Sequence, residues 1–194
     1  MSQVDGRRAR GDVTRQAAAR AAAMTATVNG LDSVTVGGLA LATGLSKSGI
    51  LTVFGTRDAI LLAAVDEARQ IYRDTVIRPM LSHGPGRPRL RALIDAWFAY
   101  VRDRVFPGGC FVAATSAEYG GRDGDIAAAV RQLKRDWLDL LESEFEADGA
   151  ADAADRAFEL DALLGEANTR YQLFGDEREL DRGRRLAGRL IDPA

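Results

Sequence analysis

Hydrophobic residues recur at intervals of three and four along most of this chain, which is the spacing of one face of an α-helix. The clearest stripes are Leu90, Ile94, Trp97 and Val101, widened by Leu93 and Tyr100, and Ile126, Val130, Leu133, Trp137, Leu141 and Phe145. No alternating strand pattern of useful length is present, and only 5 prolines interrupt the 194 residues. With 46% hydrophobic residues the chain can bury a core, so the sequence predicts an all-α protein.

The predicted helices divide the chain into an N-terminal quarter and a longer helical remainder. We expect helices over residues 14–27, 35–42, 46–54 and 57–78, then over 90–105 and 126–145, and two more near the C-terminus. The first of these is nearly all alanine, which favours helix formation but supplies little volume to bury. We place the domain boundary after residue 57, so that the domains are 1–57 and 58–194.

Composition excludes several classes of site. One cysteine leaves no internal disulfide and no cysteine-based zinc cluster, and one histidine leaves no histidine-rich metal site. We therefore expect no metal and no cofactor. The N-terminal residues are charged and polar, unlike a signal peptide, and the longest apolar run, 59–65, is far below the roughly 20 residues that cross a bilayer. The expected location is the cytoplasm, without a membrane partner.

Charge is distributed unevenly along the chain. Residues 1–57 carry seven Lys or Arg against three acids, a net charge of +4, whereas the remainder carries −6. A basic N-terminal arm that includes Arg7, Arg8, Arg10 and Arg15 is typical of a segment that meets DNA phosphates. Uneven charge is common in proteins, so this feature alone does not decide the function.

The segment 34–53 has the pattern of a helix-turn-helix. Gly44 can adopt the left-handed turn conformation between two short helices, and Ser46 is well placed to cap the second helix. The predicted core of the motif is Val36, Leu39, Ala40, Gly44, Leu45, Ile50 and Val53. Small hydrogen-bonding groups and one cation remain for the exposed side. The alternative is a hairpin of purely architectural role, because patterns of this length also arise by chance.

The order of these elements resembles the DNA-binding domain of TetR-type (tetracycline-repressor-like) transcriptional regulators. The matching residues are Arg15, Gly30, the run Thr35-Val36-Gly37-Gly38-Leu39-Ala40, the run Gly44-Leu45-Ser46-Lys47, and the run Phe54-Gly55-Thr56-Arg57-Asp58. A second likeness, to the ligand domains of one branch of the family, covers Phe106-Pro107-Gly108-Gly109-Cys110-Phe111 and Ser116-Ala117-Glu118-Tyr119. The resemblance implies a three-helix DNA-binding domain followed by a helical effector and dimerisation domain.

The implied function is a homodimeric repressor that a small apolar or aromatic molecule releases from a near-palindromic operator in double-stranded DNA. The residues predicted to meet DNA are Thr35, Ser46, Lys47, Ser48, Gly49, Thr52 and Arg57. The residues predicted to line the effector site are Trp97, Tyr100, Cys110, Phe111, Tyr119, Trp137 and Phe145. Glu118, Asn168, Tyr171 and Gln172 are further candidates for polar contacts to the effector. The two stripes, each with one tryptophan, are also typical of plain core, and Cys110 has redox sensing as a less favoured alternative.

A seam at intervals of three and four residues predicts the dimer interface near the C-terminus. Its interface residues are Leu160, Leu164, Ala167, Tyr171 and Phe174. The next helix is expected to begin at Asp176, with Glu179 completing a capping-box arrangement, and by resemblance these two helices form a four-helix bundle with a second copy. The alternative is a seam within one chain.

Two other functions remain open at this stage. Alanines replace the usual large residues at positions 18, 19 and 26, Leu51 replaces a usual aromatic, and Gly37 and Gly38 lie inside a short helix. These departures favour a marginal DNA-binding domain, or a relative that has lost DNA binding and serves as a ligand-responsive interaction protein. An all-helical enzyme is the third class; the chain has no Glu-x-x-His pair and no phosphate-binding glycine loop, so we expect no catalytic residues.

Overall fold

The computed structural model describes the backbone of residues 3–192 and the side chains of residues 11–192. Within residues 3–192 every regular element is a helix, which confirms the all-α prediction. The first helix, α1 (Gln3–Asn29), is longer than the predicted 14–27. It buries one face made of Ala18, Ala19, Ala22, Ala23 and Ala26. Because alanine is small, other helices can approach the α1 backbone closely at this face.

The helices of the N-terminal region lie close to their predicted positions. A short 3₁₀ turn, η1 (Leu31–Ser33), leads to α2 (Val36–Thr43) and α3 (Lys47–Phe54), which match the predictions 35–42 and 46–54. The predicted helix 57–78 is α4 (Arg57–Tyr72) followed by the π-helical turn η2 (Arg73–Ile77) and the short α5 (Arg78–Met80). The π turn was not predicted; it widens the helix one turn before Pro79.

The remaining helices form the larger part of the molecule. They are α6 (Arg87–Arg102), α7 (Phe111–Tyr119), α8 (Asp125–Ala147), α9 (Ala153–Phe174) and α10 (Glu177–Ile191). α7 was not predicted as a helix, since its residues lie in a segment rich in small side chains without a clear apolar stripe. The side chain of Asp176 accepts a hydrogen bond from the Arg178 amide, so the predicted start of the last helix is confirmed.

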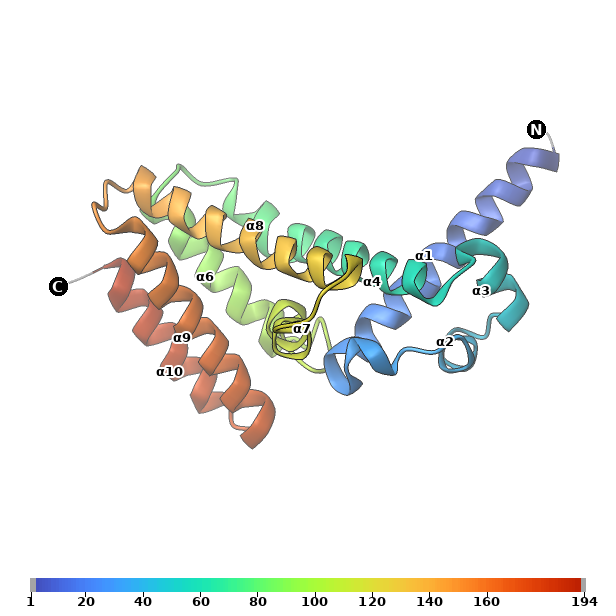
Figure 1. Ribbon diagram of the computed structural model, residues 1–194. Helices are drawn as coiled ribbons and strands as arrows, with labels where there is room; N and C mark the ends of the chain where they lie inside the picture. The colour runs from blue at the N-terminus through green and yellow to red at the C-terminus, as the bar shows by residue number, and fades with distance from the viewer. Residues whose placement is uncertain (1–2, 193–194) are drawn as a thin grey trace.

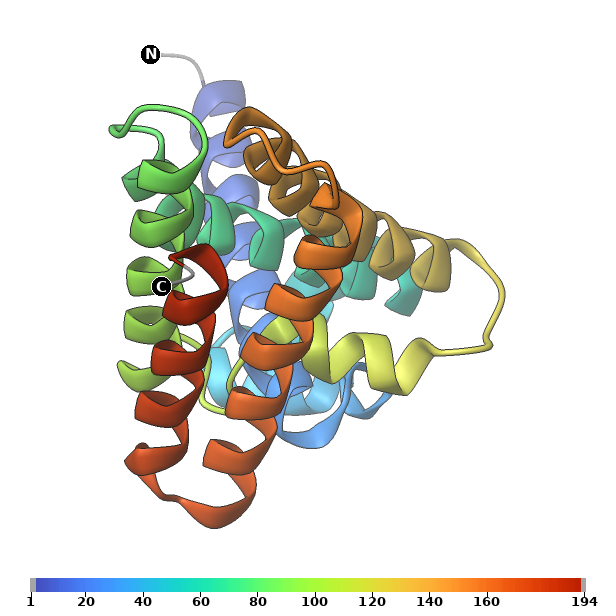
Figure 2. The ribbon, with the colours of Figure 1, turned by 90° about the vertical axis from the view of Figure 1, so that its left-hand side faces the viewer.

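The helices are arranged along an elongated molecule, with α1, α2 and α3 at one end and the α9–α10 hairpin at the other (Figure 1). α4 connects the two regions: it packs on α1 and also on α8. Seen from the end that carries the α9–α10 hairpin, α10 lies between α6 and α9 (Figure 2), in agreement with its contacts to both helices. Helix α7 touches α1 as well as α8, so it also joins the two regions.

Aromatic side chains fill the core between α4, α6 and α8. The Tyr72 ring meets the rings of Tyr100 and Trp137 edge to face, with 5.4 Å between centroids in both pairs. Both predicted stripes face this core: Leu90, Ile94, Trp97 and Val101 are buried, as are all members of the second stripe except the half-buried Ile126. The periodicity of the sequence therefore identified the interior of the larger region correctly.

The predicted dimer seam requires a correction. Leu160, Leu164, Ala167 and Tyr171 are buried within the single chain, where α9 packs on α8 and α10. Only Phe174, 61% exposed, is available to a partner. The spacing of three and four residues identified a packed face of α9 but could not say whether the partner helix belongs to the same chain. The exposed side of α9 instead carries Phe158 and Leu173, each 72% exposed.

Candidate DNA-binding surface and effector cavity

Helices α2 and α3 form a helix-turn-helix whose local geometry follows from its sequence. The Oγ1 of Thr35 accepts a hydrogen bond from the Gly38 amide at 3.0 Å, and the Oγ of Ser46 accepts one from the Gly49 amide at 3.0 Å, so each helix begins at a side-chain cap. Gly44 lies between them with φ of 70°, the left-handed conformation that favours glycine. The two helices are bent by 117° relative to each other.

The core of the motif packs as its sequence predicts. Leu39 and Ile50 are buried, and Val36, Ala40, Leu45 and Val53 are partly buried against the main core. The opposite side of α3 faces solvent, with Ser46, Lys47, Ser48 and Thr52 exposed and Gly49 half-buried. Thr35 is exposed at the start of α2. Of the seven residues predicted to meet DNA, six are therefore exposed, including Arg57, and Gly49 is half-buried.

Several of these polar groups also have partners inside the protein. The hydroxyls of Thr35 and Ser46 cap helices, and the Thr52 hydroxyl donates to the Ser48 carbonyl oxygen at 2.7 Å. The Lys47 side chain passes close to Gly37 of α2, where a side chain would meet the Lys47 Cε at 3.6 Å. Leu51, at a position that family members usually give to an aromatic residue, is 45% exposed on the same helix.

Arg57 is the seventh predicted DNA contact, and its guanidinium is committed to the protein. Its Nε donates to the Val34 carbonyl oxygen at 3.1 Å and its Nη2 to the Asp32 carbonyl oxygen at 2.6 Å. It therefore ties the start of α4 to η1. In the basic arm, the guanidinium of Arg15 lies 4.9 Å from the centre of the Phe54 ring, while the side chains of Arg7, Arg8 and Arg10 lie outside the described residues.

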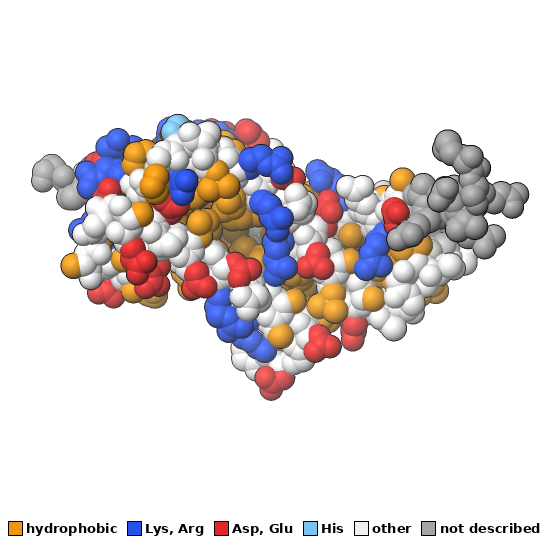
Figure 3. Space-filling model, turned by 90° about the horizontal axis from the view of Figure 1, so that it is seen from above, with side chains coloured by type: hydrophobic (Ala, Val, Ile, Leu, Met, Phe, Trp, Pro, Cys, Tyr) orange, Lys and Arg blue, Asp and Glu red, His pale blue; other side chains and the backbone are white. Residues whose placement is uncertain are grey.

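Two cavities adjoin the aromatic core. One of about 270 Å³ lies between α4 with η2 on one side and α8 on the other, and one of about 170 Å³ lies deeper, between α6, α8 and α9. Tyr72, Val112 and Trp137 line both. Figure 3 shows a hollow on this side of the molecule, lined by hydrophobic side chains with Lys and Arg side chains beside it.

The structure brings together only part of the predicted effector site. Trp97, Cys110 and Trp137 line the deeper cavity. Tyr100 lines a separate open groove beside α6, while Phe111 and Phe145 are buried and line neither cavity, as expected of plain core. Burial raises the pKa of the Cys110 thiol, and it raises the pKa of the Tyr72 and Tyr100 hydroxyls well above their ordinary value. These groups are uncharged at neutral pH.

The deeper cavity has one polar wall. The Asp161 carboxylate accepts hydrogen bonds from the Lys134 Nζ at 2.6 Å and from the Trp137 Nε1 at 2.9 Å. This bond orients the indole between the two cavities. Asn168, a candidate for effector contacts, accepts a hydrogen bond from the Cys110 amide at 3.0 Å, so its carbonyl oxygen is used to hold the loop before α7.

Glu118 and Tyr119, which we predicted to contact a ligand, lie at the joint between the two regions. The carboxylate of Glu118 accepts hydrogen bonds from the Leu31 amide at 2.6 Å and the Asp32 amide at 2.8 Å. The Tyr119 hydroxyl donates to the Asp32 carboxylate at 2.8 Å, and Arg122 pairs with the same carboxylate. The end of α7 is thus hydrogen-bonded to η1, which directly precedes the helix-turn-helix.

A close backbone approach completes this joint. The Gly108 amide donates to the Thr27 Oγ1 at 3.1 Å, and a side chain at position 108 would place its Cβ 1.9 Å from the Thr27 carbonyl oxygen. Only glycine fits there. The loop before α7 therefore contacts α1, while the end of α7 contacts η1. We call these contacts of residues 27–32 with Gly108, Glu118, Tyr119 and Arg122 the interdomain joint.

Comparisons with known proteins agree with this architecture. The family model of the tetracyclin repressor-like C-terminal domain matches residues 86–187, which is more than half of the chain. The chain belongs to the TetR family of transcriptional regulators. Membership agrees with the helix-turn-helix and the C-terminal helical domain already described. A search of curated proteins found no match.

Solved structures of TetR regulators share the whole fold. One from Chloroflexus aurantiacus J-10-FL has a TM-score of 0.86 at 21% identity, covering 95% of this chain and 96% of that one. One from Agrobacterium tumefaciens has a TM-score of 0.81 at 18% identity, covering 92% and 98%. AibR in complex with isovaleryl coenzyme A and operator DNA has a TM-score of 0.73 at 18% identity, covering 93% and 100%.

Sequence reasoning missed several residues of this TetR-family site. Tyr72, Val112 and Asp161 line the cavities, and Asp32 and Gly108 form the interdomain joint. Tyr72 lies in a predicted helix, but the sequence does not show which side of that helix faces a cavity. Asp32 looked like an ordinary turn residue, because its partners are about 90 residues away in sequence. Among these residues, only the pair Gly108 and Gly109 before Cys110 indicated in the sequence that the backbone packs closely there.

Proposed function

We propose that this protein is a homodimeric repressor that binds a near-palindromic operator through α3 and leaves it when a small apolar or aromatic molecule enters the cavities beside Trp137. The observation that carries the proposal is the capped helix-turn-helix, whose second helix exposes Ser46, Lys47, Ser48 and Thr52 on one side. An exposed helix of this kind fits the major groove, where small hydroxyls and one cation meet base edges and phosphates.

Lys47 is the cation that we assign to DNA phosphate in this motif. Replacing Lys47 with Ala should weaken binding to operator and random DNA alike and reduce the salt slope of the binding constant by about one unit, since one phosphate contact is lost. A mobility-shift titration with the protein's own upstream DNA, at several salt concentrations, measures this. Arg135→Ala, at an exposed cation on α8 in the effector domain, is the matched control. Unchanged affinity of Lys47→Ala for both DNAs would contradict the assignment.

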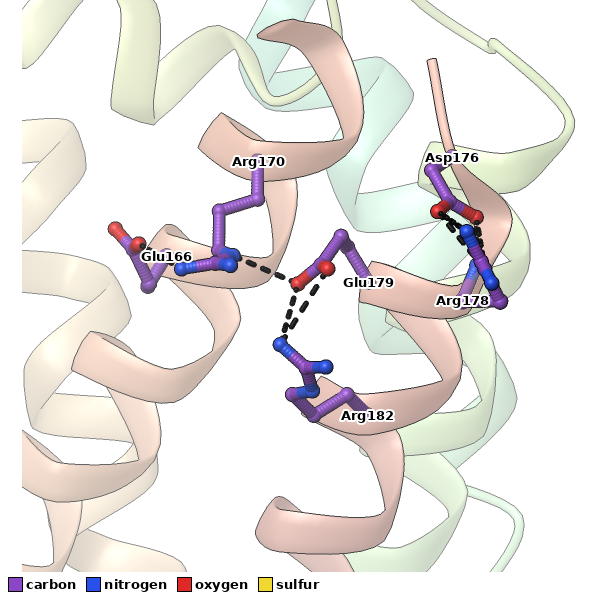
Figure 4. Close-up of polar contacts among 6 residues, drawn as sticks. All are labelled: Glu166, Arg170, Asp176, Arg178, Glu179 and Arg182. Atoms are coloured by element: carbon purple, nitrogen blue, oxygen red, sulfur yellow. Dashed lines mark hydrogen bonds and ion pairs between the residues drawn. The ribbon is translucent and has the colours of Figure 1, made fainter. Parts of the chain in front are cut away.

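Dimerisation is assigned to the outer faces of α9 and α10. These faces expose Phe158, Leu173, Phe174 and Leu186, which is unusual for side chains without a partner. The hairpin that carries them is braced at one end: the Glu179 carboxylate accepts hydrogen bonds from Arg170 at 2.7 Å and from Arg182 at 3.2 Å (Figure 4). A two-fold pairing through these faces would present two copies of α3 to successive major grooves about 34 Å apart.

The dimer is tested by placing a charge on the exposed face of α9. Leu173→Asp introduces an unpaired carboxylate that must be desolvated on pairing, so sedimentation should show monomers and operator binding should fall sharply. Leu173 is exposed in one chain, so each chain should still fold. Leu81→Asp, on an exposed loop residue away from α9, is the control. A Leu173→Asp protein that still sediments as a dimer would place the interface elsewhere.

The effector role is supported by the two cavities and by the interdomain joint. A ligand can shift DNA binding only through different affinities for two arrangements of the dimer. Cavity residues lie on α4 and α8, and α4 and α7 both contact the N-terminal helices, so a change in either helix would move α3. The division at residue 57 falls at the start of α4, where Arg57 binds η1. AibR, whose structure is a complex with isovaleryl coenzyme A and operator DNA, has the same fold.

A second candidate is a ligand-responsive interaction protein that has lost DNA binding. It is favoured by the 45% exposed Leu51 on α3 and by the commitment of Arg57 to backbone carbonyls. Failure to shift any DNA, with a dimer present, would support this candidate over the repressor. Both roles are regulatory, require no catalytic step and place the protein in the cytoplasm.

Among the described residues no single helix is long and apolar enough to cross a membrane; only the bent pair α2 and α3 passes that test when joined.

A further inference from the structure

The outer cavity between α4 and α8 combines an apolar interior with a basic rim. Its apolar lining consists of Tyr72, Ile77, Val112, Leu133, Trp137 and Leu140. Arg69, Arg73 and Asp136 complete the lining. Arg69 pairs with Asp66, which lies outside the lining, and is 3.9 Å from Asp136, so Arg73 is the rim cation that has no acidic partner within the described residues. The hollow and the basic side chains beside it lie on the face drawn in Figure 3.

The cations of the rim are incompletely satisfied by the protein. The Arg69 guanidinium is bound at one nitrogen only: its Nη1 donates to the Asp66 carboxylate at 3.3 Å, whereas its buried Nε makes no hydrogen bond and lies 3.9 Å from the Asp136 carboxylate. Asp136 accepts a hydrogen bond from Gln132 of its own helix at 2.7 Å instead. Arg73 is exposed and has no acidic partner within the described part of the chain. A buried donor without an acceptor is unfavourable, and an incoming anion would supply one.

The backbone at the rim is also distinctive. Arg73 begins the π turn η2 and Ile77 ends it, so one widened turn delivers both the cation at the mouth and an apolar group inside. Single π turns within α-helices occur frequently at functional sites.

From these observations we infer that the effector is a small amphipathic anion, whose apolar body fills the cavity against Trp137 and whose anionic head group is held by Arg69 and Arg73. A guanidinium binds carboxylate or phosphate oxygens with two parallel hydrogen bonds, so either head group suits the rim. The cavity of about 270 Å³ is smaller than the roughly 300–1,000 Å³ of sites for drug-sized ligands, so the body is short. A longer body would have to displace Trp137 and enter the deeper cavity.

This inference rests on the proposed effector role and refines the ligand class given there: the molecule is apolar in its body and carries an anionic head group. It explains why the rim carries two arginines although the effector domain as a whole is acidic. It also gives α4 a direct link to the effector, since Arg69 is on α4 and Arg73 follows its last residue.

The test compares three eight-carbon probes that differ only in the head group: octanoate, octyl phosphate and octan-1-ol. Binding to the full-length protein is followed by quenching of its tryptophans, Trp97 and Trp137, both of which line the cavities. At least one anion should bind about tenfold more tightly than the alcohol, because a hydrogen bond to a charged partner is stronger than one to a neutral partner. The tighter of the two anions identifies the head group.

Variants assign the two parts of the site. Arg69→Gln and Arg73→Gln should each reduce the preference for the anion over the alcohol, whereas the control Arg78→Gln, one turn further along and paired with Asp74, should keep it. Ile77→Trp should fill the cavity and weaken all three probes. Equal affinity for anions and alcohol, unchanged anion binding in Ile77→Trp, or no binding at millimolar concentration would each overturn the inference. The assay contains no DNA, so such a failure leaves the repressor proposal standing; probes that bind but never release operator would count against the repressor alone.

Discussion

The two ends of the molecule are packed with side chains of different size. In the N-terminal region, α1 buries five alanines against its neighbours, whereas the core around α6 and α8 buries Trp97, Phe98, Trp137 and Phe145. Buried apolar area contributes about 25 cal/mol per Å², so an alanine face stabilises much less than an aromatic one. The DNA-binding region also buries Leu31, Leu39, Ile50 and Phe54, but α1 itself adds little apolar area, which indicates that this region depends in part on its contacts with the larger region.

The interdomain joint supplies that dependence. η1 is held from both sides: Glu118 and Tyr119 of α7 bind it from the effector region, and Arg57 binds its carbonyl oxygens from α4. Segments with few large apolar contacts open at lower free energy than a well-packed core. A regulator can use this arrangement, because a small change in α4 or α7 is passed directly to η1 through these bonds.

The largest expected effect comes from the aromatic core. Phe145→Ala should reduce the free energy of unfolding of the effector region by about 3–5 kcal/mol, because it removes a fully buried ring and leaves a cavity. Denaturant unfolding followed by tryptophan fluorescence measures this region alone, since both tryptophans lie within it. Leu81→Ala, at an exposed residue, should stay within about 0.5 kcal/mol. A loss below about 1 kcal/mol for Phe145→Ala would show that this core can collapse around the gap.

Overpacking of the alanine face should act on the other region. Ala22→Leu adds three carbons where α1 is fully buried, and should cost about 1–3 kcal/mol by pushing neighbouring helices away. Operator binding should fall while the tryptophan-monitored unfolding of the effector region changes little. The control is Val13→Leu, on an exposed part of the same helix. Equal destabilisation of both regions by Ala22→Leu would mean that they unfold as one unit, against the contrast drawn above.

The sequence was sufficient for the fold class and for the helix-turn-helix, because these follow from local signals. Helical spacing, the cap at Ser46 and the turn at Gly44 are properties of short segments, and the structure confirms each. The dimer seam failed for a physical reason: Leu160 and Leu164 show the spacing of a packed face, and that spacing is the same for a neighbour in the chain and a partner outside it.

The joint and the cavity rim could not be predicted, because both depend on contacts between distant segments. Glu118 reads as a helix residue until its carboxylate is seen to accept the amides of Leu31 and Asp32. Arg73 reads as one exposed cation among many until α8 is seen to face it across a cavity. Tertiary placement, rather than local preference, gives these side chains their roles.

Glu118→Gln should loosen the joint by about 1–2 kcal/mol. Glutamine keeps one acceptor oxygen but turns an amide NH₂ toward the second backbone N–H, so one of two charge-assisted hydrogen bonds is lost. Hydrogen exchange at the Leu31 and Asp32 amides should accelerate, while exchange in α8 stays as in the wild type. Glu146→Gln, exposed on α8, is the control. Equal protection of the two amides in wild type and Glu118→Gln would remove this carboxylate from the joint.

The smallest expected effect is a dependence of the joint on acid pH. The hydrogen bond from Arg122, and then that from Tyr119, lowers the pKa of the Asp32 carboxyl below its ordinary value. A carboxyl with a lower pKa in the folded than in the unfolded protein stabilises the fold above the unfolded pKa of about 4, and this contribution disappears as pH falls through the folded pKa. Asp32 is about half exposed, so solvent screens the pair and the effect is below about 1 kcal/mol.

Exchange at the Leu31 amide should therefore be faster in Asp32→Asn than in the wild type at pH 7, and the two proteins should converge below about pH 4. Glu118 is present in both proteins, so their difference isolates Asp32. A gap that stays constant from pH 7 to pH 3 would show that Asp32 holds the joint without its charge.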